Sequence, residues 1–221
     1  MRFLFSSIGK KIQIAISGIF LCVFLLFHLI NNVTLFFGAD VFNQMVGILE
    51  SIKPVIRIME FSLLVILLLH IFNAIYLTRQ NKEKFLSKYQ AGLLSDTSSL
   101  NSRTMIITGS AILLFLIFHL AYIWYNYQIH HSDSSSMTYY SILLQNKFGF
   151  LGHTLTAFLY IFAILLIASH LKHGFESALK TFGITETSSL SFLYHLSVLF
   201  WGIIPLGFII IILSIQLGFI K

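Results

Sequence analysis

The sequence is poor in charged residues, proline and cysteine. Charged residues make up 10% of its 221 positions, against about 25% in soluble proteins, and this excludes an ordinary soluble domain. Of the two prolines, Pro205 falls inside a long apolar run, which we expect it to kink. The lone cysteine, Cys22, excludes a disulfide within the chain, covalent CxxCH attachment of haem and a cysteine-rich metal site.

Motifs of catalysis are missing as well. The sequence has no nucleophilic triad, phosphate-binding loop or carboxylate dyad, and nothing in it is suited to bind a dicarboxylate, a nucleotide or a flavin. If the chain belongs to an enzyme, another subunit must carry out that chemistry. The net charge of +6 is spread over loops between apolar segments, where basic residues set topology, so it does not indicate nucleic-acid binding.

Long apolar segments dominate what is present. Hydrophobic residues make up 57% of the chain, and its mean hydropathy is +0.88. A bilayer core needs about 20 apolar residues per helix. We therefore predict an all-α integral membrane protein, a single domain over 1–221, with five transmembrane helices at about 12–37, 55–78, 104–127, 148–171 and 190–219.

Lysine and arginine predict the direction of these spans. Ten lie at the N-terminus or in the two loops on its side: Arg2, Lys10, Lys11, Arg79, Lys82, Lys84, Lys88, Arg103, Lys172 and Lys180. The other side holds four: Lys53, Arg57, Lys147 and Lys221. The positive-inside rule then puts the N-terminus in the cytoplasm and the C-terminus outside. The basic connection at about 79–103 is either a topology signal or a docking surface for an acidic partner.

Each of the first four predicted spans contains a candidate ligand histidine, which is His28, His70, His119 and His170 in turn, whereas His153 and His195 lie near span ends. An ionisable side chain in hydrocarbon is costly, so it normally has a partner or a function. At 1.5 Å per residue, His28 lies about 24 Å and His119 about 22 Å from the cytoplasmic start of its span. His70 and His170 fall near cytoplasmic helix ends, roughly 14 Å lower. Depth thus predicts an outer pair, His28 with His119, and an inner pair, His70 with His170.

Two imidazoles on opposite faces of a planar ring are what bis-histidine haem ligation requires, and without CxxCH such a haem is b-type. The first four helices are therefore predicted to form a bundle that binds two haems b. A hydrogen bond to a neighbouring helix or a proton relay is the alternative for each histidine taken alone. His173, on the same face as His170, is a competing ligand that otherwise caps the helix or meets a propionate.

Small and basic residues recur near the inner pair. Ser17 precedes His28, and Thr108 precedes His119, by close to three helical turns, so each shares its histidine's face about 16 Å nearer the cytoplasm. With Gly18 and Gly109 beside them they would clear room for a macrocycle, although small residues are also ordinary packing positions. Four basic residues lie at the depth where the propionates of an inner haem would be: Arg79, Arg103, Lys172 and Lys180. They either bind these propionates or serve only as a topology signal.

Two carboxylates, Glu60 and Glu50, lie towards the outer side. Quinone reduction takes up protons, so both are candidates for a quinone site near the outer haem. The alternative for Glu60 is an ion pair with Arg57, three positions away on the same helix face.

Four motifs resemble the single-chain dihaem cytochrome b that anchors succinate dehydrogenase and fumarate reductase to the membrane. They are FLLFHLINN around His28, LLLHIFNAIYL around His70, FLIFHLAYIW around His119 and SHLKHGFESALKTFG around His170. The likeness covers nearly the whole chain and includes the early SSIGKK and the SRTMIITG before the third span. It implies that His70 and His170 ligate the haem nearer the iron–sulphur subunit, and that His28 and His119 ligate the distal haem.

The resemblance also implies a function in the respiratory chain. The chain would be the electron-transfer subunit of a succinate:quinone oxidoreductase in the bacterial cytoplasmic membrane, with an FAD flavoprotein and an iron–sulphur protein as cytoplasmic partners and menaquinone as the expected quinone. It allows a dimer of complexes. The alternative is a dihaem cytochrome b of a formate dehydrogenase or hydrogenase. A third reading, a transporter or proton channel with a histidine relay, predicts a colourless protein.

Overall fold

The computed structural model describes residues 5–90, 100–130, 138–184 and 190–221, and the side chains of 5–83, 104–128, 138–184 and 193–221. Within these ranges the chain is helical and contains no strand. Five helical stretches are long and apolar enough to cross a membrane: Ser7–Phe37, Lys53–Glu83, Thr104–Gln128, Thr154–Thr181 and Leu193–Gln216. The prediction of an all-α chain with five apolar spans is confirmed.

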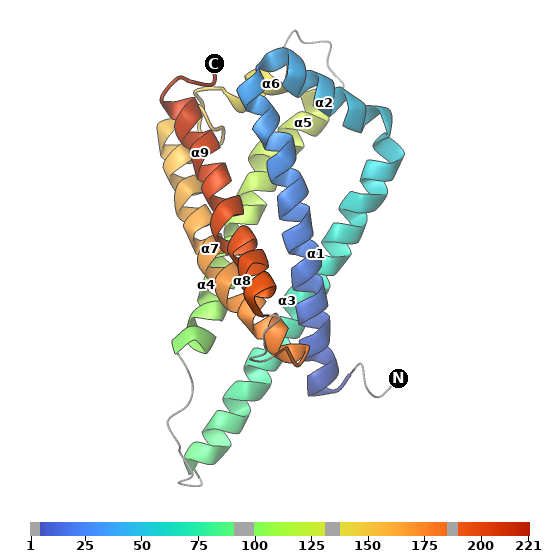
Figure 1. The fold of residues 1–221 in the computed structure, drawn as a ribbon, viewed down its shortest axis with the longest axis vertical. Coiled ribbons are helices and arrows are strands. Elements are labelled where there is room, and N and C mark those ends of the chain that lie inside the picture. The colour runs from blue at the N-terminus through green and yellow to red at the C-terminus, as the bar shows by residue number, and fades with distance from the viewer. Residues whose placement is uncertain (1–4, 91–99, 131–137, 185–189) are drawn as a thin grey trace.

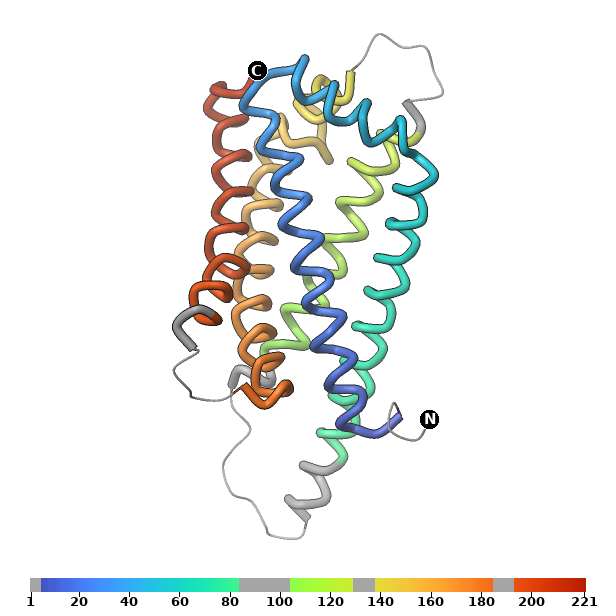
Figure 2. The backbone as a smooth tube through the Cα atoms, turned by 45° about the vertical axis from the view of Figure 1, so that its right-hand side comes forward, coloured from blue at the N-terminus to red at the C-terminus, as the bar shows by residue number. Residues whose placement is uncertain are grey.

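The long helices run side by side in alternating directions, with the N-terminus at one end of the bundle and the C-terminus at the other (Figure 1). We call these the inner and the outer end. α1 (Ser7–Val33) runs outwards into a 3₁₀ turn (Thr34–Phe37). α2 (Ala39–Ser51) then lies across the outer end (Figures 1 and 2), and α3 (Lys53–Gln90) returns.

The second half of the chain contains three further crossings. The third crossing is α4 (Leu100–His119), a π-helical turn (Leu120–Trp124) and α5 (Tyr125–His130). The short α6 (Tyr139–Leu143) leads to α7 (Thr154–Thr181), which runs inwards. The last crossing is α8 (Leu190–Val198), a second π-helical turn (Leu199–Ile203) and α9 (Ile204–Gln216).

The predicted fourth span, 148–171, is wrong at both ends. Residues 148–153 form a turn in which Gly149 has a φ of +99°, a conformation that favours glycine. The amide of Gly149 donates to Oγ1 of the fully buried Thr156 over 2.9 Å, and His153 is the N-cap of α7. The helix therefore begins at Thr154 and continues to Thr181. Hydropathy alone does not detect a turn built from apolar residues.

Pro205 was expected to kink the fifth span. The helix carries a π-helical turn at Leu199–Ile203, directly before the proline, which is buried at the start of α9. A proline removes one backbone donor and crowds the preceding turn, and a π turn is one way for a helix to adjust. The structure thus describes a π-helical turn at this position, and the expected kink stays a prediction.

Packing is uneven around the bundle. α1 packs on α3, α7 and α9, and α7 packs on α4 and α9. By contrast, the pairs α1 with α4 and α3 with α7 are not among the helix pairs that pack closely. In the most apolar stretch of α3 no residue is buried. In the most apolar stretch of the last crossing 33% of the residues are buried. The close-packed core lies along α7 and α9, while α3 stands at the periphery.

Candidate functional site

Ser17 of α1 contacts His70 of α3 at the inner part of the bundle. The Ser17 Oγ lies 3.0 Å from His70 Nδ1, and Ser17 itself is only 7% exposed. A Cβ added at Gly18 would lie 3.5 Å from Cε1 of the same ring. Ser17 and Gly18 were predicted to face the inner haem level, and the structure puts both against an inner histidine.

Thr108 of α4 makes the same contact with His170 of α7. Its Oγ1 lies 3.1 Å from His170 Nδ1, and a Cβ added at Gly109 would lie 3.3 Å from His170 Cε1. At 3.3 Å the ring would have to move for a methyl group to fit. The hydroxyl–glycine–imidazole arrangement therefore occurs twice, once between α1 and α3 and once between α4 and α7.

The two inner histidines also act on each other. His70 and His173 each lie within electrostatic range of His170. His170 is sixteen residues into α7, about 24 Å from the outer start of the helix. It remains in the inner half of the helix despite the shifted boundaries. His173 follows on the same helix and is partly buried.

The outer histidines face each other directly. The ring centroids of His28 and His119 lie 5.9 Å apart, and the ring planes are at 85°. His28 is flanked by the rings of Phe24 and Phe208, with centroids 5.6 Å and 5.5 Å away. Because α1 and α4 do not pack closely, these two side chains bridge a separation between their helices.

Two features around His119 were not predicted from the sequence. The hydroxyl of Tyr160, a buried residue of α7, lies 3.1 Å from His119 Nδ1. In addition, the π-helical turn Leu120–Trp124 begins directly after His119. Turns of this kind are frequent at functional sites. Only the tertiary fold brings Tyr160 to this ring, whereas the aromatic FLIFHLAYIW motif gave no sign of the wider turn.

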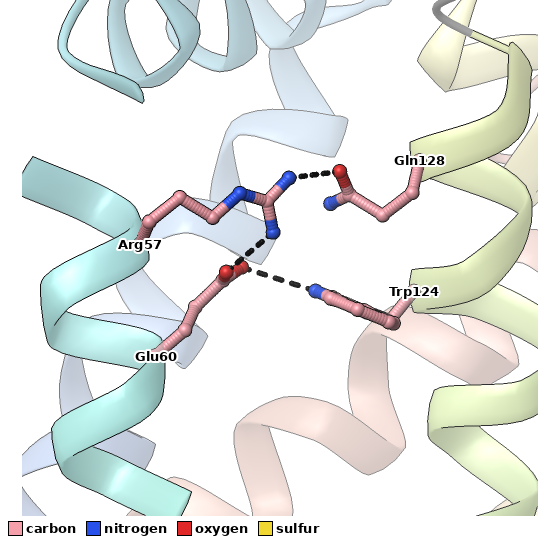
Figure 3. A network of polar contacts seen from close by, with 4 residues as sticks. All are labelled: Arg57, Glu60, Trp124 and Gln128. Atoms are coloured by element: carbon pink, nitrogen blue, oxygen red, sulfur yellow. Dashed lines mark hydrogen bonds and ion pairs between the residues drawn. The ribbon is translucent and has the colours of Figure 1, made fainter. Parts of the chain in front are cut away.

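Glu60 belongs to a polar network between α3 and the third crossing (Figure 3). Its carboxylate accepts from Arg57 over 2.5 Å and from the indole N–H of Trp124 over 3.0 Å. Arg57 also donates to the side-chain oxygen of Gln128. The ion pair with Arg57 that the sequence offered as the alternative is present, and the network joins two helices that otherwise touch little.

Glu50 has different partners. It lies on α2, and its Oε1 accepts a hydrogen bond of 2.6 Å from the Tyr139 hydroxyl. Burial, followed by the hydrogen bond to Glu50 and the charge of that carboxylate, raises the pKa of Tyr139. Tyr139 also stacks edge-on against Tyr127, with ring centroids 4.9 Å apart. The hydrogen bond between Tyr139 and Glu50 thus joins α6 to α2.

The predicted propionate partners are less well defined. The Lys172 ammonium lies 5.1 Å from the centre of the Trp201 ring, and Lys180 and Arg79 are exposed. The side chain of Arg103 lies outside the described residues. These cations are not brought together into one cluster by any described contact.

Comparison with known proteins returns nothing: no family model matches this chain, and neither a curated protein nor a solved structure is significantly similar to it.

Proposed function

We propose that this chain is the dihaem cytochrome b membrane anchor of a succinate:quinone oxidoreductase and binds two b haems. The observation that carries the proposal is the separation of the His28 and His119 rings. Two imidazoles whose centroids lie about 6 Å apart would leave room for one metal ion bound to a nitrogen of each ring. The measured separation is 5.9 Å, between helices that do not pack closely on each other.

The inner site is supported by its surroundings. Imidazole is a normal axial ligand of haem iron, and ligating histidines usually bind a polar partner through the second ring nitrogen. His70 and His170 each have a hydroxyl at Nδ1, which leaves Nε2 for a metal. Gly18 and Gly109 leave room beside these rings that a Cβ would take up. The donor set of two imidazoles, each with a hydroxyl at Nδ1, therefore fits a second bis-histidine haem.

When bound, the haems would supply one-electron carriers at two depths. The residues of this chain would ligate them through the outer and inner pairs and hold the rings in orientation. Glu60 and Glu50 stay candidates for proton exchange with the quinone at the outer end, while Lys172, Lys180, Arg79 and Arg103 stay candidates for the inner propionates. Menaquinone is the expected quinone.

The basic inner side supports the proposed orientation. By the positive-inside rule that side is cytoplasmic, in a bacterial inner membrane. The iron–sulphur and flavoprotein subunits would dock there, and electrons would pass through the inner and outer haems to a quinone near Glu60, or in reverse. The dicarboxylate chemistry would belong to the flavoprotein.

The test is purification of the detergent-solubilised complex with haem quantification and mass spectrometry on one sample. A pyridine haemochrome assay should give two b haems per chain, and acid acetone should extract both. Co-purification of a flavoprotein and an iron–sulphur protein of the succinate type supports the proposal, whereas formate dehydrogenase or hydrogenase subunits would favour that class. A colourless protein would favour the remaining alternative, a transporter or proton channel that uses the histidines as a proton relay.

A further inference from the structure

Ser17 and Thr108 occupy matched positions in two helix pairs, and each hydroxyl touches the Nδ1 of one inner histidine. We propose that these two hydroxyls are positioning residues that fix the tautomer of His70 and His170, with the proton on Nδ1 and the lone pair of Nε2 free to bind metal. This inference rests on the proposed function, since it concerns ligands of the inner haem.

The direction of the Ser17 hydrogen bond follows from its second contact. The Ser17 Oγ lies 3.0 Å from the carbonyl oxygen of Ile14, one helical turn earlier. A hydroxyl carries one proton, and a carbonyl can only accept. The Ser17 proton therefore goes to Ile14, and its oxygen accepts from Nδ1–H of His70, whose ring also hydrogen-bonds the Ile14 carbonyl.

Thr108 repeats this arrangement. Its Oγ1 lies 3.1 Å from the carbonyl oxygen of Thr104 and 3.2 Å from that of Met105. The single proton of the Thr108 hydroxyl is shared between these carbonyls, so the oxygen accepts from Nδ1–H of His170. Both inner rings are thus held as Nδ1–H tautomers by hydroxyl oxygens that donate their own protons to backbone carbonyls.

The adjacent glycines complete the seat of each ring. A Cβ added at Gly18 would lie within 4 Å of Cε1 and Nδ1 of His70. A Cβ added at Gly109 would lie within 4 Å of the same two atoms of His170. In both cases Nε2 lies more than 4 Å from this Cβ position. The ring is therefore bound by one edge, and its ligating nitrogen faces away from the Ser-Gly or Thr-Gly step.

The outer pair is built differently. His119 meets the phenol of Tyr160, and in the part of the chain that the structure describes no hydroxyl contacts the ring of His28, which lies against Phe24 and Phe208. Removing the hydroxyl at Ser17 or Thr108 should therefore alter the inner haem alone.

The experiment is redox titration of the purified complex carrying Thr108→Val, with Thr108→Ser as the matched control that keeps the hydroxyl. An imidazole whose Nδ1–H is hydrogen-bonded is a stronger ligand for ferric iron. Thr108→Val should raise the midpoint potential of the inner haem, identified as the one lost in His170→Ala. A tenfold loss of ferric over ferrous preference corresponds to about 59 mV in a one-electron couple. Ser17→Ala should act in the same direction, and the outer haem should keep its potential.

The outcomes distinguish failure of the positioning role from failure of the proposed haem-binding function. An inner haem unchanged in potential and spectrum in both Thr108→Val and Ser17→Ala overturns the positioning role, and so does an equal shift in Thr108→Ser and Thr108→Val. If Thr108→Val loses the inner haem while Thr108→Ser retains it, the hydroxyl is required for binding and the role stands; loss in both variants overturns it. A wild-type chain without haem would instead overturn the proposed function.

Discussion

The imidazole rings of His28 and His119 meet across helices that do not pack closely on one another, with centroids 5.9 Å apart and planes at 85°. Each ring is contacted by its own aromatic neighbours, Phe24 and Phe208 for His28 and Phe115 for His119. Two ionisable side chains brought together in an apolar bundle are costly unless they share a ligand or a proton. A haem held between the two rings would account for this relationship.

Replacing His28 or His119 with alanine should remove the outer haem and leave the inner one. By the proposed function, each histidine pair would hold one haem between two helices, so loss of one ligand would weaken the binding of that haem. Haem content and redox titration of both variants would measure this. Loss of the same haem in His28→Ala and His70→Ala would contradict the pairing.

Replacing His70 or His170 with alanine should remove the inner haem. His173→Ala is the matched control, because His173 lies one turn further along α7 and interacts with His170 without a described hydroxyl partner. We expect His173→Ala to keep both haems. A complex that loses a haem in His173→Ala but keeps both in His170→Ala would make His173 the ligand.

Tyr160→Phe should keep the outer haem bound but raise its midpoint potential, since it removes the hydrogen bond of 3.1 Å at His119 Nδ1. Losing one such bond should also lower the free energy of unfolding by about 1 kcal/mol. Spectroscopic titration and thermal melting in detergent would check both effects. An unchanged outer haem in Tyr160→Phe would show that the contact does not influence ligation.

Glu60→Gln should depress quinone-linked turnover while both haems stay bound and the soluble subunits still reduce an artificial acceptor. Because Glu60 also holds Arg57 and Trp124, a structural role must be separated from proton exchange. Trp124→Phe serves as the control, since it removes one bond of the network but keeps the carboxylate. Equal loss of turnover in both variants would assign Glu60 to the clamp between helices. Unchanged turnover in Glu60→Gln and in Glu50→Gln would end the carboxylate hypothesis.

Tyr139→Phe should lower the melting temperature by removing the bond to Glu50, at a cost of about 1 kcal/mol for a partly solvated charged hydrogen bond. The pKa of Tyr139 is raised by burial and then by Glu50, so the folded protein favours the protonated phenol. This contribution is fully present below about pH 10 and is lost as the pH rises through the folded pKa. The difference in melting temperature between wild type and Tyr139→Phe should therefore shrink above pH 10.

The number of spans could be read from the sequence because hydropathy integrates over about 20 residues. Their ends could not. The apolar turn before Thr154 looks like helix to any hydropathy window, and the charged pair Lys10-Lys11 hides the true start of α1 at Ser7. The errors in the helix ends did not change the half of the membrane assigned to His170. That assignment depends mainly on the direction in which the helix runs, and shifting an end by a few residues changes the depth little.

The contacts of the candidate site were predictable only where helical geometry governs them. Depth and face are properties of one helix, so the sequence suggested that Ser17 and Thr108 lie at the inner level. Their hydrogen bonds to His70 and His170 depend on how neighbouring helices rotate, and the sequence suggested clearance for a macrocycle instead. The approach of Tyr160 to His119 likewise depends on tertiary packing alone.

The contacts of the four histidines follow two opposite patterns. Each hydroxyl contact stays within one half of the chain, from α1 to α3 or from α4 to α7, whereas each ring pair joins the two halves. Neither half alone therefore contains a complete pair. If the proposed pairing is right, a polypeptide cut in the connection between α3 and α4 would hold a complete pair of haem ligands only when its two fragments associate.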